Sequence, residues 1–234
     1  MHAFFAPLAA PAKPLAGAAF ALALLLAQTA RADPFCLCLK CVFSTYERFA
    51  SAAGEMKPTL EPDQCSIAHM FADGARSVDP GDIVVIKHPE TGIPYIFRVV
   101  ATAGQTVAMD NGLLSINGTP VVLTVGEPYV QKLRPEGRLG SMPLCPDTTM
   151  PGETCTIERL TETLPNGQSY AILNTVEASL LDTIKDRAVP PGHLFVLGDN
   201  RDDAADSRLS LTKGGIGMVP LQSVIGVVIE IGLP

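Results

Sequence analysis

Two Asn-Gly dipeptides, at residues 111–112 and 117–118, constrain the fold of this chain more than any other feature. Each lies between short apolar runs, and Asn-Gly is the strongest short-range signal for a β-hairpin because its turn needs positive φ at both residues. Other turn dipeptides punctuate the neighbouring sequence. We therefore expect a turn-rich, mainly β domain with strands at residues 83–87, 95–102, 106–109, 113–116, 120–124, 170–174, 193–197 and 224–231.

The segments between these strands are less regular. Residues 127–168 are rich in Pro, Gly and Thr, which predicts an extended insertion with little regular structure. Residues 175–187 suit one short helix. We divide the chain into an export segment at 1–32, a lead-in at 33–53 and a β-domain at 54–234 that contains the insertion.

The amino terminus has the features of a secretory signal. Lys13 precedes an apolar run at residues 15–27, and Ala30-Arg31-Ala32 follows as a small-x-small cleavage site, so we expect the mature chain to begin at Asp33. The alternative is an uncleaved membrane anchor, although prolines interrupt residues 3–27 and a spanning helix needs about 20 apolar residues. Either interpretation places the β-domain outside the cytoplasm, in the periplasm or anchored to the inner membrane.

Charge and composition exclude some functions. The formal net charge is -7 and no cluster of Lys or Arg offsets it locally, which argues against a nucleic-acid partner. Hydrophobic residues make up 47% of the chain and charged residues 18%, which argues against disorder.

An even set of 6 cysteines in an exported chain favours disulfides. We expect Cys145 to pair with Cys155, because the proline and glycine residues between them suit a tight turn. The pairing among Cys36, Cys38, Cys41 and Cys65 stays open. Zinc is the competing interpretation of the Cys36–Cys41 spacing, and it would require His69 as a fourth ligand.

Three segments in a fixed order resemble a known family. Residues 54–60 read Gly-Glu-Met-Lys-Pro-Thr-Leu, and residues 80–85 and 95–100 read Pro-Gly-Asp-Ile-Val-Val and Tyr-Ile-Phe-Arg-Val-Val. Residues 198–208 read Gly-Asp-Asn-Arg-Asp-Asp-Ala-Ala-Asp-Ser-Arg, which is the most specific of the three. Together they resemble the nucleophile box, lysine strand and Gly-Asp-Asn-Arg signature of bacterial type I signal peptidases, the Ser/Lys peptidases of family S26. The resemblance implies their mostly antiparallel β-domain of the signal peptidase and LexA-like type.

The chemistry of that family needs a serine nucleophile, a lysine base kept neutral by burial, and donors to the oxyanion. Carried over by position, the nucleophile's place holds Glu55 and the lysine's place holds Phe97. Ala53 replaces the oxyanion hydroxyl, and Ala204 replaces the serine that orients the lysine. The resemblance thus implies a degenerate dyad, without metal or cofactor, in a retained scaffold of Gly54, Met56, Pro58, Arg98, Gly198, Asp199, Asn200, Arg201, Asp206 and Arg208.

Each substituted residue has two interpretations. Glu55 is either a carboxylate facing Phe97 with a raised pKa or, as we favour, a solvated side chain on a loop. Phe97 is expected to be a core aromatic that fills the lysine's space. Ser51 and Lys57 are the groups that would have to replace the dyad, and in an extended segment Lys57 lies about 7 Å from the Glu55 site.

The Asp/Arg-rich segment at residues 198–208 also has two interpretations. We favour a structural turn in which Asp199, Arg201, Asp206 and Arg208 pair with one another. A calcium loop is the alternative, but Arg201 stands where an oxygen ligand is needed.

Three functions follow from these patterns. The first is a non-catalytic protein that binds extended segments of exported proteins by β-augmentation, or modulates a signal peptidase paralogue, near a membrane surface. The second is an active signal peptidase with a displaced dyad. The third is a purely structural periplasmic protein, because fold does not imply function.

Overall fold

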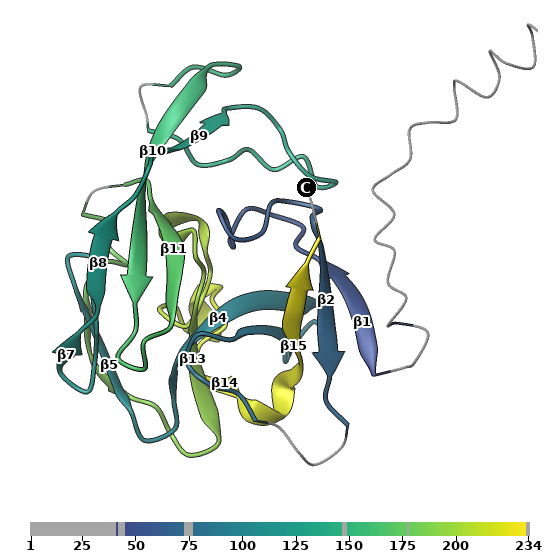
Figure 1. Cartoon of the computed structure of the whole chain (residues 1–234), viewed down its shortest axis with the longest axis vertical. Helices are drawn as coiled ribbons and strands as arrows, with labels where there is room; N and C mark the ends of the chain where they lie inside the picture. The colour runs from purple at the N-terminus through teal and green to yellow at the C-terminus, as the bar shows by residue number, and fades with distance from the viewer. Residues whose placement is uncertain (1–40, 42–44, 73–76, 147–148, 177, 233–234) are drawn as a thin grey trace, which may run out of the picture. The chain divides into compact units, whose positions relative to one another are not determined.

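The computed structural model describes residues 41, 45–72, 77–146, 149–176 and 178–232 (Figure 1). The expected export segment, with its cleavage site, and the cysteines at 36 and 38 lie outside the described residues. Within the described ranges, none of the helices has the length and apolar character needed to cross a membrane.

The largest sheet has seven strands in the order β1-β2-β15-β3-β4-β13-β14, and all of its neighbours are antiparallel. Its strands are β1 (Tyr46–Ala50), β2 (Cys65–Met70), β3 (Ile83–Lys87), β4 (Pro94–Thr102), β13 (His193–Leu197), β14 (Val219–Pro220) and β15 (Val224–Ile231). β3 and the middle of β4 are buried on both faces, which explains why they read as continuous apolar runs.

Two smaller antiparallel sheets complete the domain. One is ordered β12-β5-β6-β7 and the other β11-β10-β8, with β9 also paired to β10. Their strands are β5 (Thr106–Asp110), β6 (Leu113–Ile116), β7 (Thr119–Pro120), β8 (Val122–Val125), β9 (Tyr129–Lys132), β10 (Thr154–Thr163), β11 (Ser169–Asn174) and β12 (Ile184–Ala188). Short 3-10 helices lie at η2 (Arg201–Asp203), η3 (Leu211–Lys213) and η4 (Leu221–Ser223).

The hairpins predicted from the Asn-Gly dipeptides are confirmed. Asn111 and Gly112 have φ of 48° and 80° between β5 and β6, and Asn117 and Gly118 have φ of 54° and 75° between β6 and β7. Positive φ at both residues is what a two-residue hairpin turn requires. The mainly antiparallel β fold is therefore as expected.

One expectation about the connecting segments holds only in part, and another is wrong. Most of the insertion lies outside strands, but it also holds β9 and the 10-residue β10, which pairs with β8, β9 and β11. Residues 175–187 do not form a helix: their carboxyl end is the start of β12, which pairs with β5. In both cases pairing with distant strands outweighs the local composition. β1, likewise, lies in the lead-in, where the sequence has no clear strand period.

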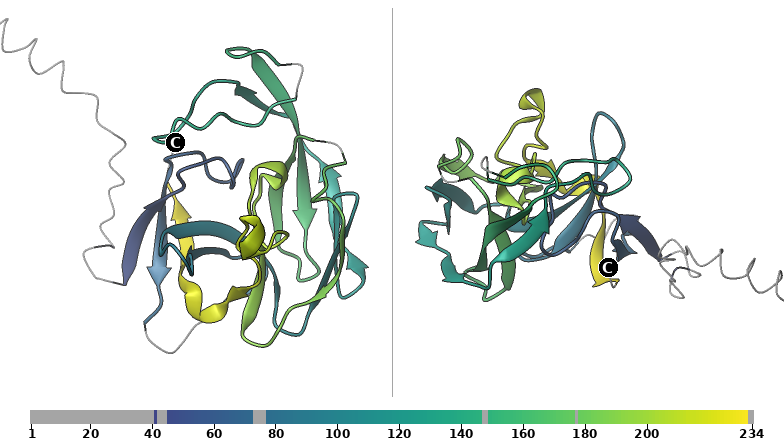
Figure 2. Two further views of the ribbon diagram at one scale, coloured as in Figure 1. Left: turned by 180° about the vertical axis from the view of Figure 1, so that it is seen from behind. Right: turned by 90° about the horizontal axis from the view of Figure 1, so that it is seen from above.

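The arm formed by β9 and β10 stands beside the segment that joins β1 to β2. In Figure 1 the loop between β9 and β10 arches over the dark segment that follows β1, and both views in Figure 2 agree. The expected disulfide, Cys145–Cys155, is present at the base of this loop. Cys41 and Cys65 are disulfide-bonded too, so neither is a thiolate ligand for zinc.

Candidate functional site

The site begins with the segment that follows β1. Residues 51–60 form a series of turns rather than an extended strand. The amide of Lys57 donates to the carbonyl of Gly54 at 3.1 Å, and that of Leu60 donates to the carbonyl of Met56 at 2.9 Å. Met56 and Leu60 are fully buried, which anchors the turns on the core. The segment is therefore not extended, which removes the basis for the spacing expected between Lys57 and the Glu55 site.

Glu55 is fixed by its backbone. Its carbonyl oxygen accepts the amide of Asn200 at 3.0 Å, and the side-chain amide of Asn200 donates to the carbonyl of Gly54 at 3.0 Å. The Glu55 carboxylate is half-buried and accepts a hydrogen bond from the Ser51 hydroxyl. Burial raises the pKa of Glu55, the bond from Ser51 lowers it, and Asp203 raises it further, with a net upward shift. The favoured interpretation, a solvated side chain, does not describe this carboxylate.

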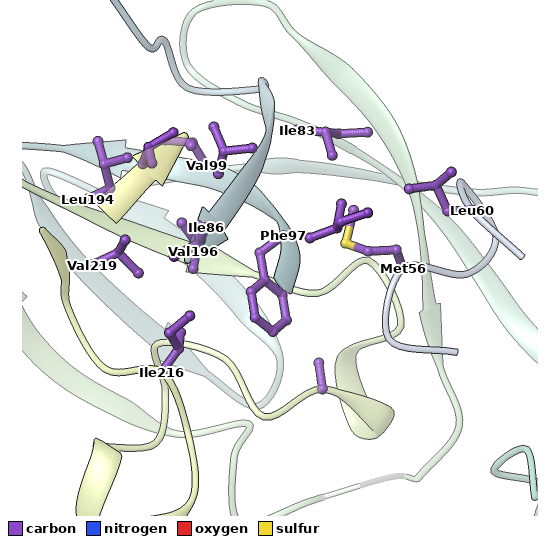
Figure 3. Packing of buried hydrophobic residues seen from close by; sticks show 14 residues of the cluster. Met56, Leu60, Ile83, Ile86, Phe97, Val99, Leu194, Val196, Ile216 and Val219 are labelled. Carbon is purple, nitrogen blue, oxygen red and sulfur yellow. The ribbon is translucent and has the colours of Figure 1, made fainter. Parts of the chain in front are cut away.

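Phe97 lies in the main core. Only 1% of it is exposed, and it packs in one buried cluster with Met56, Leu60 and Ala204 (Figure 3). Its ring stacks on Tyr95 with centroids 6.2 Å apart and planes 13° apart. A phenyl ring in such a place contributes burial energy and has no acid–base role.

Gly198 joins the end of β13 to the same site. A Cβ atom there would lie 2.4 Å from the Cβ of Ala204 and 2.6 Å from the carbonyl oxygen of Glu55. The three backbones can approach this closely only because residue 198 has no side chain. Glu55 and Ala204, at which the resemblance predicts a nucleophile and a lysine-orienting hydroxyl, thus both lie against Gly198.

The Asp/Arg segment is a buried network of ion pairs. As expected, Asp206 pairs internally with Arg208, at 2.9 Å, and also accepts the amide of Gly198 at 3.1 Å. The expectation of internal pairing is wrong for Asp199 and holds only in part for Arg201, whose Nε donates to the carbonyl of Gly198 at 3.2 Å while its ion pair lies outside the segment. Asp199 accepts two bonds from Arg98 of β4, at 2.7 and 2.6 Å, and Arg201 donates to Glu162 of β10 at 2.8 Å. Buried guanidinium groups need carboxylates, and the fold supplies these from distant strands.

Lys57 is the residue that sequence reasoning undervalued. It is 1% exposed, although lysine is rarely buried unless paired. Its Nζ donates to Oε1 of Gln131 at 2.9 Å and to the carboxylate of Glu136, and Oε2 of Glu61 lies 3.8 Å away. Gln131 lies in β9 and Glu136 lies in the loop between β9 and β10, so both acceptors belong to the arm and its loop. A lysine within the box, residues 54–60, could have indicated a charged site, but nothing in the sequence indicated its partners, which lie 74 and 79 residues away.

Asp203 completes this charged group. A Cβ at Gly54 would lie 3.1 Å from its Oδ2 and 3.5 Å from both Cδ of Lys57 and Oε1 of Glu136. Burial raises the pKa of Asp203, Lys57 lowers it and Glu136 raises it, with a net upward shift. Gly54 therefore lies at the centre of a mixed-charge cluster built from the box, η2 and the arm.

The serine and the lysine of this segment, Ser51 and Lys57, are both buried. The Nζ atom of Lys57 is hydrogen-bonded to Gln131 and Glu136, and neither partner is a hydroxyl nucleophile. Ser51 is bonded to Glu55 but only 3% exposed, which keeps its hydroxyl away from a peptide carbonyl. Within the described residues, no three or more His, Cys, Asp or Glu side chains are grouped to hold a metal ion. The fold and site define a β framework in which the box is held against the Asp/Arg segment and packs on Phe97.

Comparison with known proteins identifies that framework. The profile of the family described as signal peptidase, peptidase S26, matches residues 19–232. The signal peptidase I of Pseudomonas aeruginosa PAO1 is 30% identical over 200 residues, which cover 77% of this chain and 62% of that protein. The chain belongs to the signal peptidase S26 family.

Other similar proteins carry the same name. The signal peptidase I of Pseudomonas fluorescens is 29% identical over 202 residues, covering 77% of this chain and 62% of its own length. A solved signal peptidase I from Enterococcus faecalis V583 is 24% identical with a TM-score of 0.33, covering 67% of this chain and 100% of the solved chain. This chain thus spans 62% of the length of each of the two Pseudomonas relatives.

Proposed function

We propose that this chain is a non-catalytic member of the S26 family that binds extended segments of exported proteins. The observation that carries the proposal is the open side of β4. β3 pairs with β4 from Pro94 to Arg98, whereas β13 pairs with β4 only from Arg98 onward. Among the described strands, none pairs with Pro94–Phe97 on the β13 side.

The pairing register between β3 and β4 shows which way the backbone amide and carbonyl groups of β4 point. The amide and carbonyl of Val99 both bond toward the start of β3, at Asp82 and Gly81. Successive residues of an antiparallel strand point their amide and carbonyl groups to opposite sides, so those of Ile96 face the open side. A peptide strand added there would gain main-chain hydrogen bonds without any chemistry.

The substitutions support binding rather than hydrolysis. Removing a catalytic nucleophile or its base costs on the order of a millionfold in rate in enzymes of this type. Here Glu55 and Phe97 replace both, and Ala53 and Ala204 remove the supporting hydroxyls. Meanwhile Asn200 and Gly198 still hold the box against the Asp/Arg segment. The framework that positions a peptide is retained where the groups that cut it are not.

We place this activity at the periplasmic side of the inner membrane, where exported chains emerge. Extended signal-peptide segments are the expected ligands, and a signal peptidase paralogue is the alternative partner. The two Pseudomonas relatives are named signal peptidase I, which supports a role connected with signal peptides.

Amide hydrogen exchange on the full chain tests this function. A synthetic peptide that spans the cleavage site of an exported protein serves as the probe. Saturating peptide should slow exchange at Ile96 by about tenfold or more, because its amide gains a partner. The amide of Phe97, which faces β3, is the internal control and should change little. Saturable binding that leaves Ile96 unaffected would contradict the proposed edge, and no saturable binding would favour a purely structural protein.

A second candidate is an active peptidase with a displaced site. The bond between the Ser51 hydroxyl and Glu55 favours it, because a serine beside a carboxylate is a recognisable nucleophile–base arrangement. This candidate requires that both Ser51→Ala and Glu55→Ala abolish cleavage of a preprotein.

A further inference from the structure

The segment that follows β9 and ends at the disulfide contacts the box and its neighbours at several points. We call this segment, residues 133–145, the strap. Glu136 of the strap pairs with Lys57. Arg138 of the strap lies 3.2 Å from Oδ1 of Asp63 and donates to the carbonyl of Ala50 at 3.3 Å. From neighbouring β9, the Tyr129 hydroxyl donates to Glu61 at 2.7 Å. These contacts run along the whole segment between β1 and β2.

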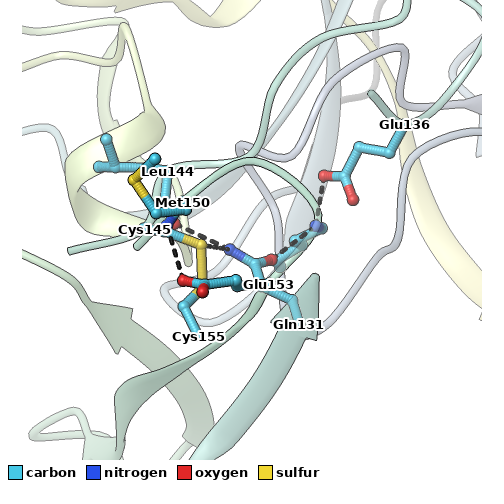
Figure 4. Close-up of a disulfide and its surroundings, with 8 residues drawn as sticks. Gln131, Glu136, Leu144, Cys145, Met150, Glu153 and Cys155 are labelled. Atoms are coloured by element: carbon cyan, nitrogen blue, oxygen red, sulfur yellow. Dashed lines mark hydrogen bonds and ion pairs between the residues drawn. A yellow bond between two sulfur atoms is a disulfide. The ribbon is translucent and has the colours of Figure 1, made fainter. Parts of the chain in front are cut away.

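A chain of hydrogen bonds connects Lys57 to the disulfide Cys145–Cys155 (Figure 4). The side chain of Gln131 accepts from Lys57 and donates to the carbonyl of Leu144 at 2.8 Å. The next residue, Cys145, is bonded to Cys155 at the start of β10, with Cα atoms 5.9 Å apart. The covalent bond therefore holds Leu144 at the place where it orients the Gln131 amide toward Lys57.

The strap covers backbone groups that an added strand would use. The carbonyl of Thr45 bonds to the amide of Met70 in β2, so by alternation the carbonyl of Ala50 faces the open side of β1. Arg138 occupies that carbonyl. A Cβ at Gly137 would lie 3.2 Å from the carbonyl oxygen of Ala52, so the strap backbone rests directly on the next outward group.

Three strands separate the covered edge from β4 in the order of the sheet, and the buried core connects the two. Phe49 of β1 packs against the same buried cluster that contains Phe97 of β4. The box, with Met56 and Leu60, lies in that cluster too. A peptide bound along β4 would therefore add to a strand that packs on the same core as the box, which the strap contacts.

We propose that the strap is a redox-controlled cover of the peptide site, closed while Cys145–Cys155 is intact. This inference rests on the proposed peptide-binding function. Reduction by a dithiol breaks the S–S bond, forms two thiols and converts the reductant to its disulfide, with two electrons transferred. Once the loop is no longer closed, the strap gains conformational freedom and releases Lys57 and the carbonyls of Ala50 and Ala52.

The accessibility of Lys57 reports the state of the strap. The full chain is treated with an amine-acylating reagent, and modification of each lysine is followed by mass spectrometry. Because reduction also affects the disulfides of Cys41 and Cys65, the double variant Cys145→Ser/Cys155→Ser is compared with the oxidised chain. Lys57 should react at least tenfold faster in the double variant, whereas exposed Lys87 should be unchanged. Equal protection of Lys57 in both would overturn the proposal.

Peptide affinity gives the second readout. The variant Glu136→Gln/Arg138→Ala loosens the strap with the disulfide intact, so it separates release of the strap from a general loss of stability. Both this variant and the serine variant should bind the peptide roughly tenfold tighter than the oxidised chain, about 1.4 kcal/mol. Binding of equal strength in all three would overturn the cover and leave the peptide-binding function standing. Binding in none would overturn the function itself, along with the cover that depends on it.

Discussion

The carbonyl oxygen of Glu55 accepts the backbone amide of Asn200 at 3.0 Å, which joins the box to the Asp/Arg segment. The Asn200 side chain repeats the connection through the carbonyl of Gly54. Hydrogen bonds from the Asp/Arg segment therefore hold the framework around the site. We expect substitutions in this framework, and at Glu55 and Phe97, to have the following effects.

Asn200→Ala should destabilise the protein by about 1 kcal/mol, because the buried carbonyl of Gly54 loses its side-chain donor. Urea unfolding of the full chain measures this change. Asn174→Ala is the matched control: it removes an exposed hydrogen bond of 3.2 Å to Glu158 and should change stability by less than about 0.5 kcal/mol. Equal effects in the two variants would contradict the role given to Asn200.

Gly198→Ala should destabilise by about 2 kcal/mol or more, because the added methyl group overlaps both Ala204 and the carbonyl of Glu55. Gly126→Ala is the comparison, since a Cβ there would come no closer than 3.3 Å to a neighbouring atom. Urea unfolding curves of the two variants test the difference. A Gly198→Ala protein as stable as the Gly126→Ala protein would rule out the close approach.

Much of the fold follows from local signals, and the site does not. β3, β6, β13 and β15 match the expected ranges because each is a short apolar run bounded by turn residues. The partners of Lys57 and the pairing of Asp199 with Arg98, 101 residues apart, depend on how strands meet in space. The periodicity of the sequence does not indicate which strands become neighbours. The substituted dyad positions were found only because the surrounding motifs resemble those of a family.

The raised pKa of Glu55 predicts a specific pH dependence of stability. A carboxyl whose folded pKa lies above its unfolded value of 4.5 contributes full stability below that value, and the contribution is lost as pH rises through the folded pKa. Glu55→Gln, which stays uncharged, should therefore gain stability relative to the native chain as pH rises above 4.5. Thermal unfolding between acid and neutral pH measures the difference.

Exposed Glu127 provides the control for this experiment. Glu127→Gln, a surface substitution, should change the free energy of unfolding by less than about 0.5 kcal/mol. Suppose that the difference in unfolding stability between Glu55→Gln and the native chain stays constant from acid to neutral pH. Burial then does not control the protonation of Glu55.

Restoring the dyad alone should not restore hydrolysis. In Glu55→Ser/Phe97→Lys, the lysine enters an apolar cluster and the ring's packing is lost, which should cost about 3 kcal/mol or more in urea unfolding. Phe97→Leu keeps the apolar character and should cost about 1 kcal/mol. No preprotein cleavage is expected from the restored pair, because Ala53 and Ala204 still lack their hydroxyls. Rapid cleavage would show that the supporting hydroxyls are dispensable.

Measuring binding and cleavage of one preprotein in the same sample tests the central claim most directly. The full chain is incubated with a labelled preprotein, the bound fraction is determined by titration, and the product is analysed by mass spectrometry. Saturable binding with an intact signal peptide after prolonged incubation is the predicted result. Cleavage at the signal junction that both Glu55→Ala and Ser51→Ala abolish would contradict the account and establish a displaced catalytic site.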